Sequence, residues 1–273
     1  MFKIQVGPTV ENFLDWLQSN FQPLFGFVKS VIEFIMDNLE WLFLLLPSII
    51  LIILISALSW KLAGKKVAIF TFIGFVFIDA MGLWEQTMIT VSMVLTSAII
   101  ALIIGVPVGI WASKNNSVDR VVRPILDFMQ TMPAYVYMIP AVQFFDIGKV
   151  PGVIATIIFA MPPAVRLTNL GIRQVPKDVV EAARAFGSTG KQLLMKVQLP
   201  LATKTILAGV NQTIMLSLSM VVLSAMIGAK GLGFEVYNGI TQLKIGQGFE
   251  SGVAVVILAM VLDRITQALA KND

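Results

Sequence analysis

Long uncharged apolar runs dominate the chain, and short segments that hold most of the charged residues separate them. A run of about 20 apolar residues can cross the hydrocarbon core of a bilayer as a helix. The pattern predicts seven spans, at residues 42–60, 67–83, 87–112, 131–145, 150–165, 205–229 and from 251 to about 264.

The fourth and fifth spans are short and rich in proline. Each is barely long enough to cross, and proline removes a backbone donor inside a helix. We therefore expect broken or tilted helices that pack against their neighbours. The prolines are Pro133, Pro140, Pro151, Pro162 and Pro163.

Residues 1–40 have a different pattern from the spans. Apolar residues recur there at helical spacing, against Lys29, Glu33 and Asp37. This spacing is typical of an amphipathic helix that lies on a membrane surface. We predict such a segment before the first span.

Composition supports a membrane protein. Of the 273 residues, 57% are hydrophobic and 13% are charged, whereas a soluble domain carries about 25% charge. Cysteine and histidine are absent, which excludes disulfides, thiol nucleophiles, imidazole bases and the usual zinc, haem and iron–sulfur ligands. A membrane enzyme is therefore disfavoured.

The basic residues indicate how the chain is oriented. Fifteen Lys and Arg residues lie in one alternating set of loops, and only Lys149, Lys230 and Lys244 lie in the other. Because positive loops stay in the cytoplasm, we predict the C-terminus inside and the N-terminal segment outside. The net charge of +4 is thus a topology signal, and no nucleic-acid partner is expected.

Residues 166–204 form the largest of the positive loops. Pro176 and Asp178 predict a helix start, and Gly187 can supply the left-handed stop. Ser188 or Thr189 can cap a second helix that runs to about residue 198. We predict a rigid helix–turn–helix outside the bilayer, to which another protein can bind.

The same loop resembles the cytoplasmic EAA loop of ABC importer permeases. The match consists of Glu181-Ala182-Ala183, Gly187 and Leu199-Pro200, with Val197 in place of the usual isoleucine. The resemblance implies that the loop docks in a groove of an ATPase subunit. Two alanines permit close approach, and Glu181 can make a charge-assisted contact. An ordinary amphipathic helix at the membrane surface is the alternative. The expected coupling residues are Glu181, Ala182, Ala183, Gly187, Leu199 and Pro200.

A narrower likeness covers nearly the whole chain. Residues 127–142 (DFMQTMPAYVYMIPAV), 168–175 (TNLGIRQV) and 211–233 resemble the glycine betaine and proline betaine permeases of the ProU/OpuA type. The resemblance implies an all-α type I ABC importer fold, with a five-helix core at 87–273, a two-helix scaffold at 41–86, and two copies around a central path. It also implies a bacterial cytoplasmic membrane, two ATPase subunits and a separate extracytoplasmic binding protein.

The energy source is expected on a partner. A phosphate-binding loop would need glycine at Ala185 and a hydroxyl at Gln192. We therefore expect no cofactor, metal site or enzymatic activity on this chain, and ATP and Mg²⁺ on the ATPase.

Betaine recognition needs cation–π faces for the methylated ammonium and donors for the carboxylate. Packing and interhelical hydrogen bonds are the ordinary alternative for such side chains in spans. The candidate path residues are Tyr135, Tyr137, Gln143, Asn211, Gln212, Met215, Ser217 and Ser219.

The leading hypothesis is an ATP-driven importer of glycine betaine for osmoprotection, with proline betaine, carnitine and choline left open as cargo. An ion-coupled secondary transporter is the alternative. That alternative needs charge networks inside the membrane, whereas Asp79 is predicted near the outer interface and Arg166 at the inner end of a span.

Overall fold

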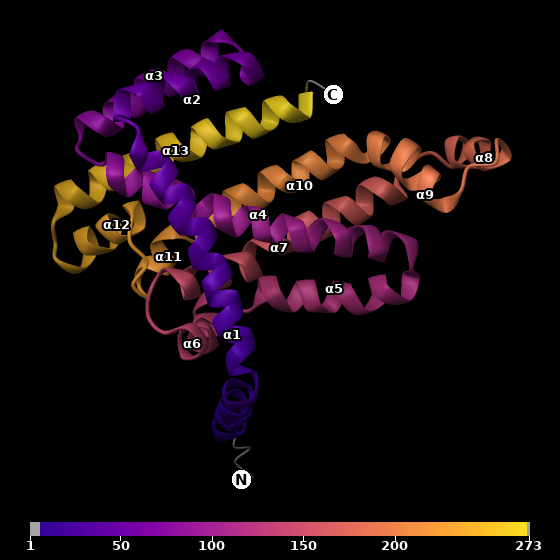
Figure 1. Ribbon diagram of the computed structural model, residues 1–273, viewed down its shortest axis with the longest axis horizontal. Coiled ribbons are helices and arrows are strands. Elements are labelled where there is room, and N and C mark those ends of the chain that lie inside the picture. The colour runs from indigo at the N-terminus through magenta and orange to yellow at the C-terminus, as the bar shows by residue number, and fades with distance from the viewer. Residues whose placement is uncertain (1–5, 272–273) are drawn as a thin grey trace.

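The computed structural model describes residues 6–271, and this part of the chain is helical without strands (Figure 1). The helices are α1 Val6–Leu45, α2 Ser48–Ala63, α3 Lys65–Ala80, α4 Trp84–Lys114, α5 Asn116–Thr131, α6 Ala134–Phe145, α7 Lys149–Arg173, α8 Lys177–Ala185, α9 Gly190–Leu193, the π-helical turn Leu194–Gln198, α10 Leu199–Ser219, α11 Val221–Ala225, α12 Leu232–Thr241 and α13 Ile245–Lys271.

The body is a bundle in which α7 packs between α4 and α10, and α13 joins α10 to the α2–α3 hairpin (Figure 1). Within residues 6–271, four helices are long and apolar enough to cross a bilayer: α4, α7, the continuous stretch Gly190–Ala225, and α13. The helices α2, α3 and α6 are apolar but have only 16, 16 and 12 residues. The expected count of seven crossings is therefore not confirmed.

The predicted first span, residues 42–60, is wrong as a single helix. The chain bends by 105° between α1 and α2, at Pro47. Proline lacks the backbone donor and its ring clashes with the preceding turn. Because Pro47 sits inside an apolar run, hydropathy alone does not reveal the break.

Helix α1 crosses the long helices and packs on α4, α6 and α7 (Figure 1). Ile32 and Met36 are buried in the core, while most of its other side chains are exposed. Lys29 pairs with Asp146 at 3.0 Å, and Asp37 pairs with Lys149. The one-sided burial suits an amphipathic helix, although it continues past residue 40 to Leu45. Its place on the membrane surface stays a prediction.

The sixth span also departs from its predicted bounds of 205–229. It begins earlier, because the second hairpin helix continues through the π-helical turn into α10 without closing at Leu199-Pro200. Pro200 lies in the first turn of α10, where its missing donor costs little. At the other end a single turn residue, Met220, separates α10 from the short helix α11, and the stretch ends at Ala225.

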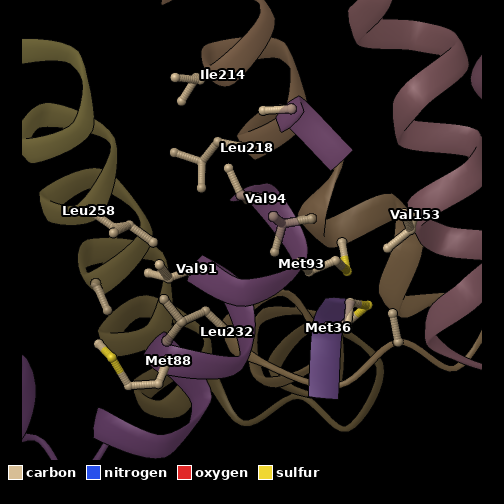
Figure 2. Packing of buried hydrophobic residues seen from close by; sticks show 14 of the residues in the cluster. Met36, Met88, Val91, Met93, Val94, Val153, Ile214, Leu218, Leu232 and Leu258 are labelled. Carbon is tan, nitrogen blue, oxygen red and sulfur yellow. The ribbon is translucent and has the colours of Figure 1, made fainter. Parts of the chain in front are cut away.

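Close helix crossings bring the core together. A Cβ on Gly109 of α4 would lie 2.7 Å from both the Thr168 Cβ and the Val165 carbonyl oxygen of α7. Glycine is therefore required for α4 and α7 to approach this closely. The largest group of buried apolar side chains draws on several helices, as Figure 2 shows for Met36, Met88, Val153, Leu232 and Leu258.

Candidate functional site

The predicted helix–turn–helix is present and lies at one far end of the molecule (Figure 1). After α8, Gly187 has a φ of +79°, which is a left-handed conformation that favours glycine. Thr189 caps α9: its Oγ1 accepts from the Gln192 backbone, and its own N–H donates to Gln192 Oε1 at 2.8 Å. This reciprocal capping box makes the turn rigid and identifies Thr189 as the cap.

The outer face of this hairpin has almost no cover from the rest of the chain. Glu181 and Ala182 are exposed and Ala183 is partly buried. Phe186, next to Gly187, is 91% exposed. An exposed aromatic side chain beside two alanines is a surface suited to a protein partner. Sequence reasoning missed Phe186, although its position directly before the turn glycine was a usable signal.

Leu199 and Pro200 lie at the base of the hairpin rather than on its outer face. Leu199 packs against a small core of Ile172, Leu194 and Ala202. Leu199 therefore joins the hairpin to α10 and α7, whereas Pro200 is exposed in the first turn of α10.

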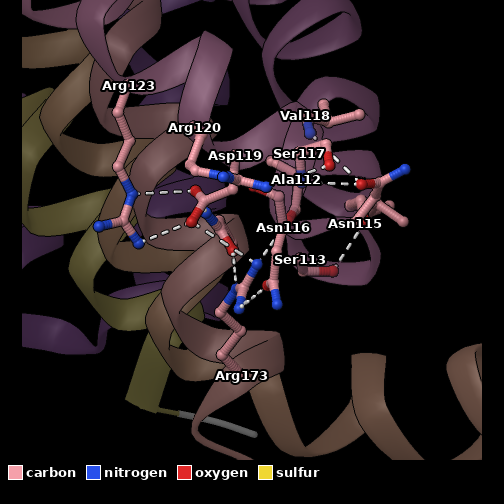
Figure 3. Close-up of polar contacts among 12 residues, drawn as sticks. Ala112, Ser113, Asn115, Asn116, Ser117, Val118, Asp119, Arg120, Arg123 and Arg173 are labelled. Carbon is pink, nitrogen blue, oxygen red and sulfur yellow. Dashed lines mark hydrogen bonds and ion pairs between the residues drawn. The ribbon is translucent and has the colours of Figure 1, made fainter.

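A polar cluster stands beside the hairpin, where α4, α5 and α7 meet (Figure 3). Asp119 is buried and accepts from Arg123 Nε at 3.0 Å and from Asn169 Nδ2 at 2.7 Å. Arg173 lies 3.6 Å from the same carboxylate and donates to the Ala112 carbonyl oxygen at 2.8 Å. The cluster ties the ends of the three helices together and so fixes the base of the hairpin.

The electrostatics of Asp119 follow from these contacts. Burial alone would raise the pKa of its carboxyl group, but the hydrogen bonds from Arg123 and Asn169 and the nearby guanidinium charges hold that pKa below its ordinary value. The members of this cluster are spread over residues 112–173, so no local sequence motif indicates it.

The candidate path residues on α6 separate into different environments. Tyr135 is exposed and its hydroxyl donates to Met226 Sδ at 3.4 Å. Tyr137 is buried, and its hydroxyl has no hydrogen-bond partner among the described residues. Gln143 turns toward α1, where its Nε2 donates to Asp15 Oδ1 at 2.7 Å.

The candidates on α10 also divide. Ser217 and Ser219 donate to backbone oxygens of their own helix, both at 2.9 Å. Asn211, Gln212 and Met215 instead line one cavity of about 380 Å³ between α5, α7 and α10. The structure thus brings three of the eight candidates together.

Arg166 of α7 lines that cavity as well. It donates to Asp127 Oδ1 at 2.6 Å and to Gln130 Oε1, both on α5. Arg166 thus forms an ion pair, but the helix continues for seven residues beyond it to Arg173. Arg166 is therefore not at the helix end.

Comparison with known proteins gives relatives over nearly the whole chain. The chain is 53% identical to the glycine betaine transport system permease protein OpuAB of Bacillus subtilis, over 97% of this chain and 94% of that protein. It is 50% identical to the glycine betaine/carnitine transport permease protein GbuB of Listeria monocytogenes, over 98% and 96%. It is 46% identical to the glycine betaine/proline betaine transport system permease protein ProW of Escherichia coli, over 99% and 76%.

A solved structure has the same fold. Inward-facing MetNI, a methionine ABC transporter, superposes with a TM-score of 0.63 at 22% identity, over 71% of this chain and 94% of the matched chain. The expected type I ABC importer fold is therefore confirmed. The family model described as the binding-protein-dependent transport system inner membrane component matches residues 105–272. Together with the relatives at 46–53% identity, this match shows that the chain belongs to that family, as a permease subunit of an ABC importer.

Proposed function

We propose that this permease imports glycine betaine or a related betaine as an osmoprotectant, and that ATP hydrolysis on a partner subunit drives the transport. The exposed hairpin of α8 and α9, with Phe186 at its tip, is the observation that carries the ATP-driven part. The names of the relatives at 46–53% identity support betaines as the cargo.

The assembly we propose has two copies of this permease, two ATPase subunits and a separate extracytoplasmic binding protein in a bacterial cytoplasmic membrane. The hairpin and the C-terminus face the cytoplasm and the N-terminus faces outward, as the distribution of Lys and Arg predicts. ATP and Mg²⁺ then bind on the ATPase, because this chain lacks a phosphate-binding loop.

Coupling follows from the continuity of the hairpin with α10. The helical stretch runs from Gly190 to Ala225, so a displacement of the hairpin moves the part of α10 that carries Asn211 and Gln212. Closure of the ATPase and docking of a loaded binding protein would each favour one orientation of this bundle. Because the two events are linked through that orientation, each would make the other more favourable. A shift from 1:99 to 99:1 between two orientations takes about 5.5 kcal/mol.

Transport in proteoliposomes tests this function. We expect the permease, reconstituted with its ATPase and binding protein, to accumulate labelled glycine betaine only with ATP inside. A panel of proline betaine, carnitine and choline would rank the cargo. Accumulation by the permease alone, or with an ATPase that cannot hydrolyse ATP, would contradict the proposal.

Choline is the weaker candidate cargo. The choline transport system permease protein OpuBB of Bacillus subtilis is 28% identical over 65% of this chain. Choline also lacks the carboxylate that the betaines share. We expect its uptake to be slower than that of glycine betaine.

A further inference from the structure

The ion pair between Arg166 and Asp127 stands in an unusual place. Arg166 lies seven residues before the end of α7, or about 10 Å along the axis at 1.5 Å per residue. Helix α7 is one of the helices long and apolar enough to span the bilayer. The pair therefore lies about 10 Å in from the end of a spanning helix, between that helix and α5.

Both charged groups are only partly covered by this chain. The Arg166 side chain is 41% exposed and that of Asp127 is 67% exposed. Charged side chains at membrane depth face the bundle interior or a water-filled cavity, because contact with lipid tails is costly. This face of α5, α7 and α10 must consequently border water or protein.

The cavity at this face combines charged and amide side chains with apolar ones, and the amide of Asn211 is also bonded to Asp263 and Thr266 of α13. Its lining includes Gln130, Arg166, Asn211, Gln212 and Met215, with a volume of about 380 Å³. A second cavity of about 340 Å³ adjoins it and shares Arg166, with Asp127 on its wall. Arg166 thus lines both cavities, whereas Asp127 lines only the second one.

We propose that Arg166 and Asp127 form a transient binding site for a zwitterion on the transport path, with Arg166 taking the carboxylate of the solute. The planar guanidinium can bind a carboxylate through two parallel hydrogen bonds. The methylated ammonium, which has no N–H to donate, pairs with Asp127 by charge alone. In the bound state the carboxylate of the solute takes the place of Asp127 beside Arg166, and the ammonium of the solute takes the place of Arg166 beside Asp127. Both charged side chains therefore keep a partner of opposite charge.

This exchange explains why such a site can release its cargo. When the solute leaves, Arg166 and Asp127 pair again at 2.6 Å, and Gln130 continues to hold the guanidinium. Binding is therefore weakened by competition from the internal pair. The site also favours solutes that carry a carboxylate over choline.

The proposed binding site rests on the proposed betaine transport, and the following test distinguishes failure of the site from failure of transport. In proteoliposomes of the full complex, we expect Arg166→Gln to reduce the betaine taken up per ATP hydrolysed by at least about tenfold, while ATP hydrolysis continues. Arg166→Lys should fall between that variant and the unmodified protein. The matched control is Arg120→Gln on α5, whose guanidinium bonds, among the described residues, only to Asn116 and Ser117 of its own helix and which lines neither cavity; it should leave the ratio unchanged.

An unchanged ratio in Arg166→Gln would overturn the site while leaving betaine transport in place. Failure of the unmodified complex to take up betaine would instead overturn the proposed function. As a second measurement, Met215→Cys, which lines the same cavity and leaves Arg166 and Asp127 in place, should react with a water-soluble thiol reagent, and millimolar glycine betaine should slow that reaction. Reaction only with a lipid-soluble reagent, or no protection by betaine, would contradict the site.

Discussion

Asp119 is the residue on which the polar cluster beside the hairpin depends. Its carboxylate accepts from two helices and stands near two guanidinium groups. Removing the negative charge leaves Arg173 and Arg123 facing each other without compensation. Removal of such a buried, hydrogen-bonded carboxylate destabilises the fold, because its positively charged partners are left without compensation.

We predict that Asp119→Asn lowers the free energy of unfolding by about 1–3 kcal/mol. The check is the unfolding temperature of the purified permease, with Glu11→Gln, an exposed acid on α1, as the control. An equal unfolding temperature in both variants would contradict the role of the cluster.

The pH dependence of this contribution has a definite sign. The folded pKa of Asp119 lies below its ordinary value of 3.8. Its stabilising contribution is therefore fully present above that ordinary value, and is lost as the pH falls through the lowered folded pKa. The difference in unfolding temperature between the unmodified protein and Asp119→Asn should stay constant from neutral pH down to about pH 5 and narrow only in stronger acid.

Substitution of glycine by alanine should affect stability differently at two positions of the chain. At Gly109 an added methyl group meets the Val165 carbonyl oxygen at 2.7 Å, whereas at Gly26 nothing lies within 4 Å. Gly109→Ala should cost about 1–3 kcal/mol of stability through overpacking, while Gly26→Ala should be neutral or slightly stabilising. Thermal unfolding in detergent compares the two, and similar unfolding temperatures would contradict the close α4–α7 contact.

At the scale of elements, local signals predicted the hairpin well. Proline before α8, glycine after it and a capping threonine each act within a few residues, so the sequence alone is sufficient to place them. The bend at Pro47, the amphipathic helix α5 and the helix α12 were not predicted. The bend is a local effect of proline that the apolar run conceals, whereas α5 and α12 are placed by contacts with distant helices, such as Arg166 with Asp127 and Leu232 N–H with Thr90 Oγ1.

The candidate site residues likewise divide into those that a local motif indicates and those that only tertiary packing brings together. Hairpin residues were found by a contiguous motif, whereas the grouping of Asn211, Gln212 and Met215 with Arg166 depends on the packing of α5, α7 and α10. Gln143 and Ser217 look equally polar in the sequence. Their hydrogen bonds to Asp15 and to the Thr213 backbone are tertiary or helical details that composition does not reveal.

We predict that the outer face of the hairpin determines association with the ATPase. Phe186→Ser and Glu181→Lys should each weaken that association at least about tenfold, because truncating a central aromatic or reversing a contact charge costs more than 1 kcal/mol. Co-purification at fixed ATPase concentration measures this effect. Phe13→Ser, which removes an exposed phenylalanine from α1 instead, is the matched control. Normal association in both hairpin variants would contradict the assignment.

At the scale of the whole molecule, the described features lie along one axis. The hairpin and the turn between α4 and α5 lie toward one side of the bundle in Figure 1, α12 lies at the other, and α13 runs from the side of α12 toward the middle. The cavity that holds Arg166 lies between them, beside the helix that continues from the hairpin. This arrangement suits a permease in which a partner at one side alters access to a site in the middle.

The central claim is that an ATPase grips the hairpin from the cytoplasm. The chain has no cysteine, so Ala182→Cys provides a single thiol on the exposed face of α8, and Asn12→Cys provides one on α1 as the reference for the outer side. Labelling with a membrane-impermeant maleimide in oriented vesicles then measures access. The account predicts that the thiol at position 182 reacts only from the cytoplasmic side and is protected when the ATPase binds. Reaction from the outer side, or unchanged reaction with the ATPase bound, would contradict it.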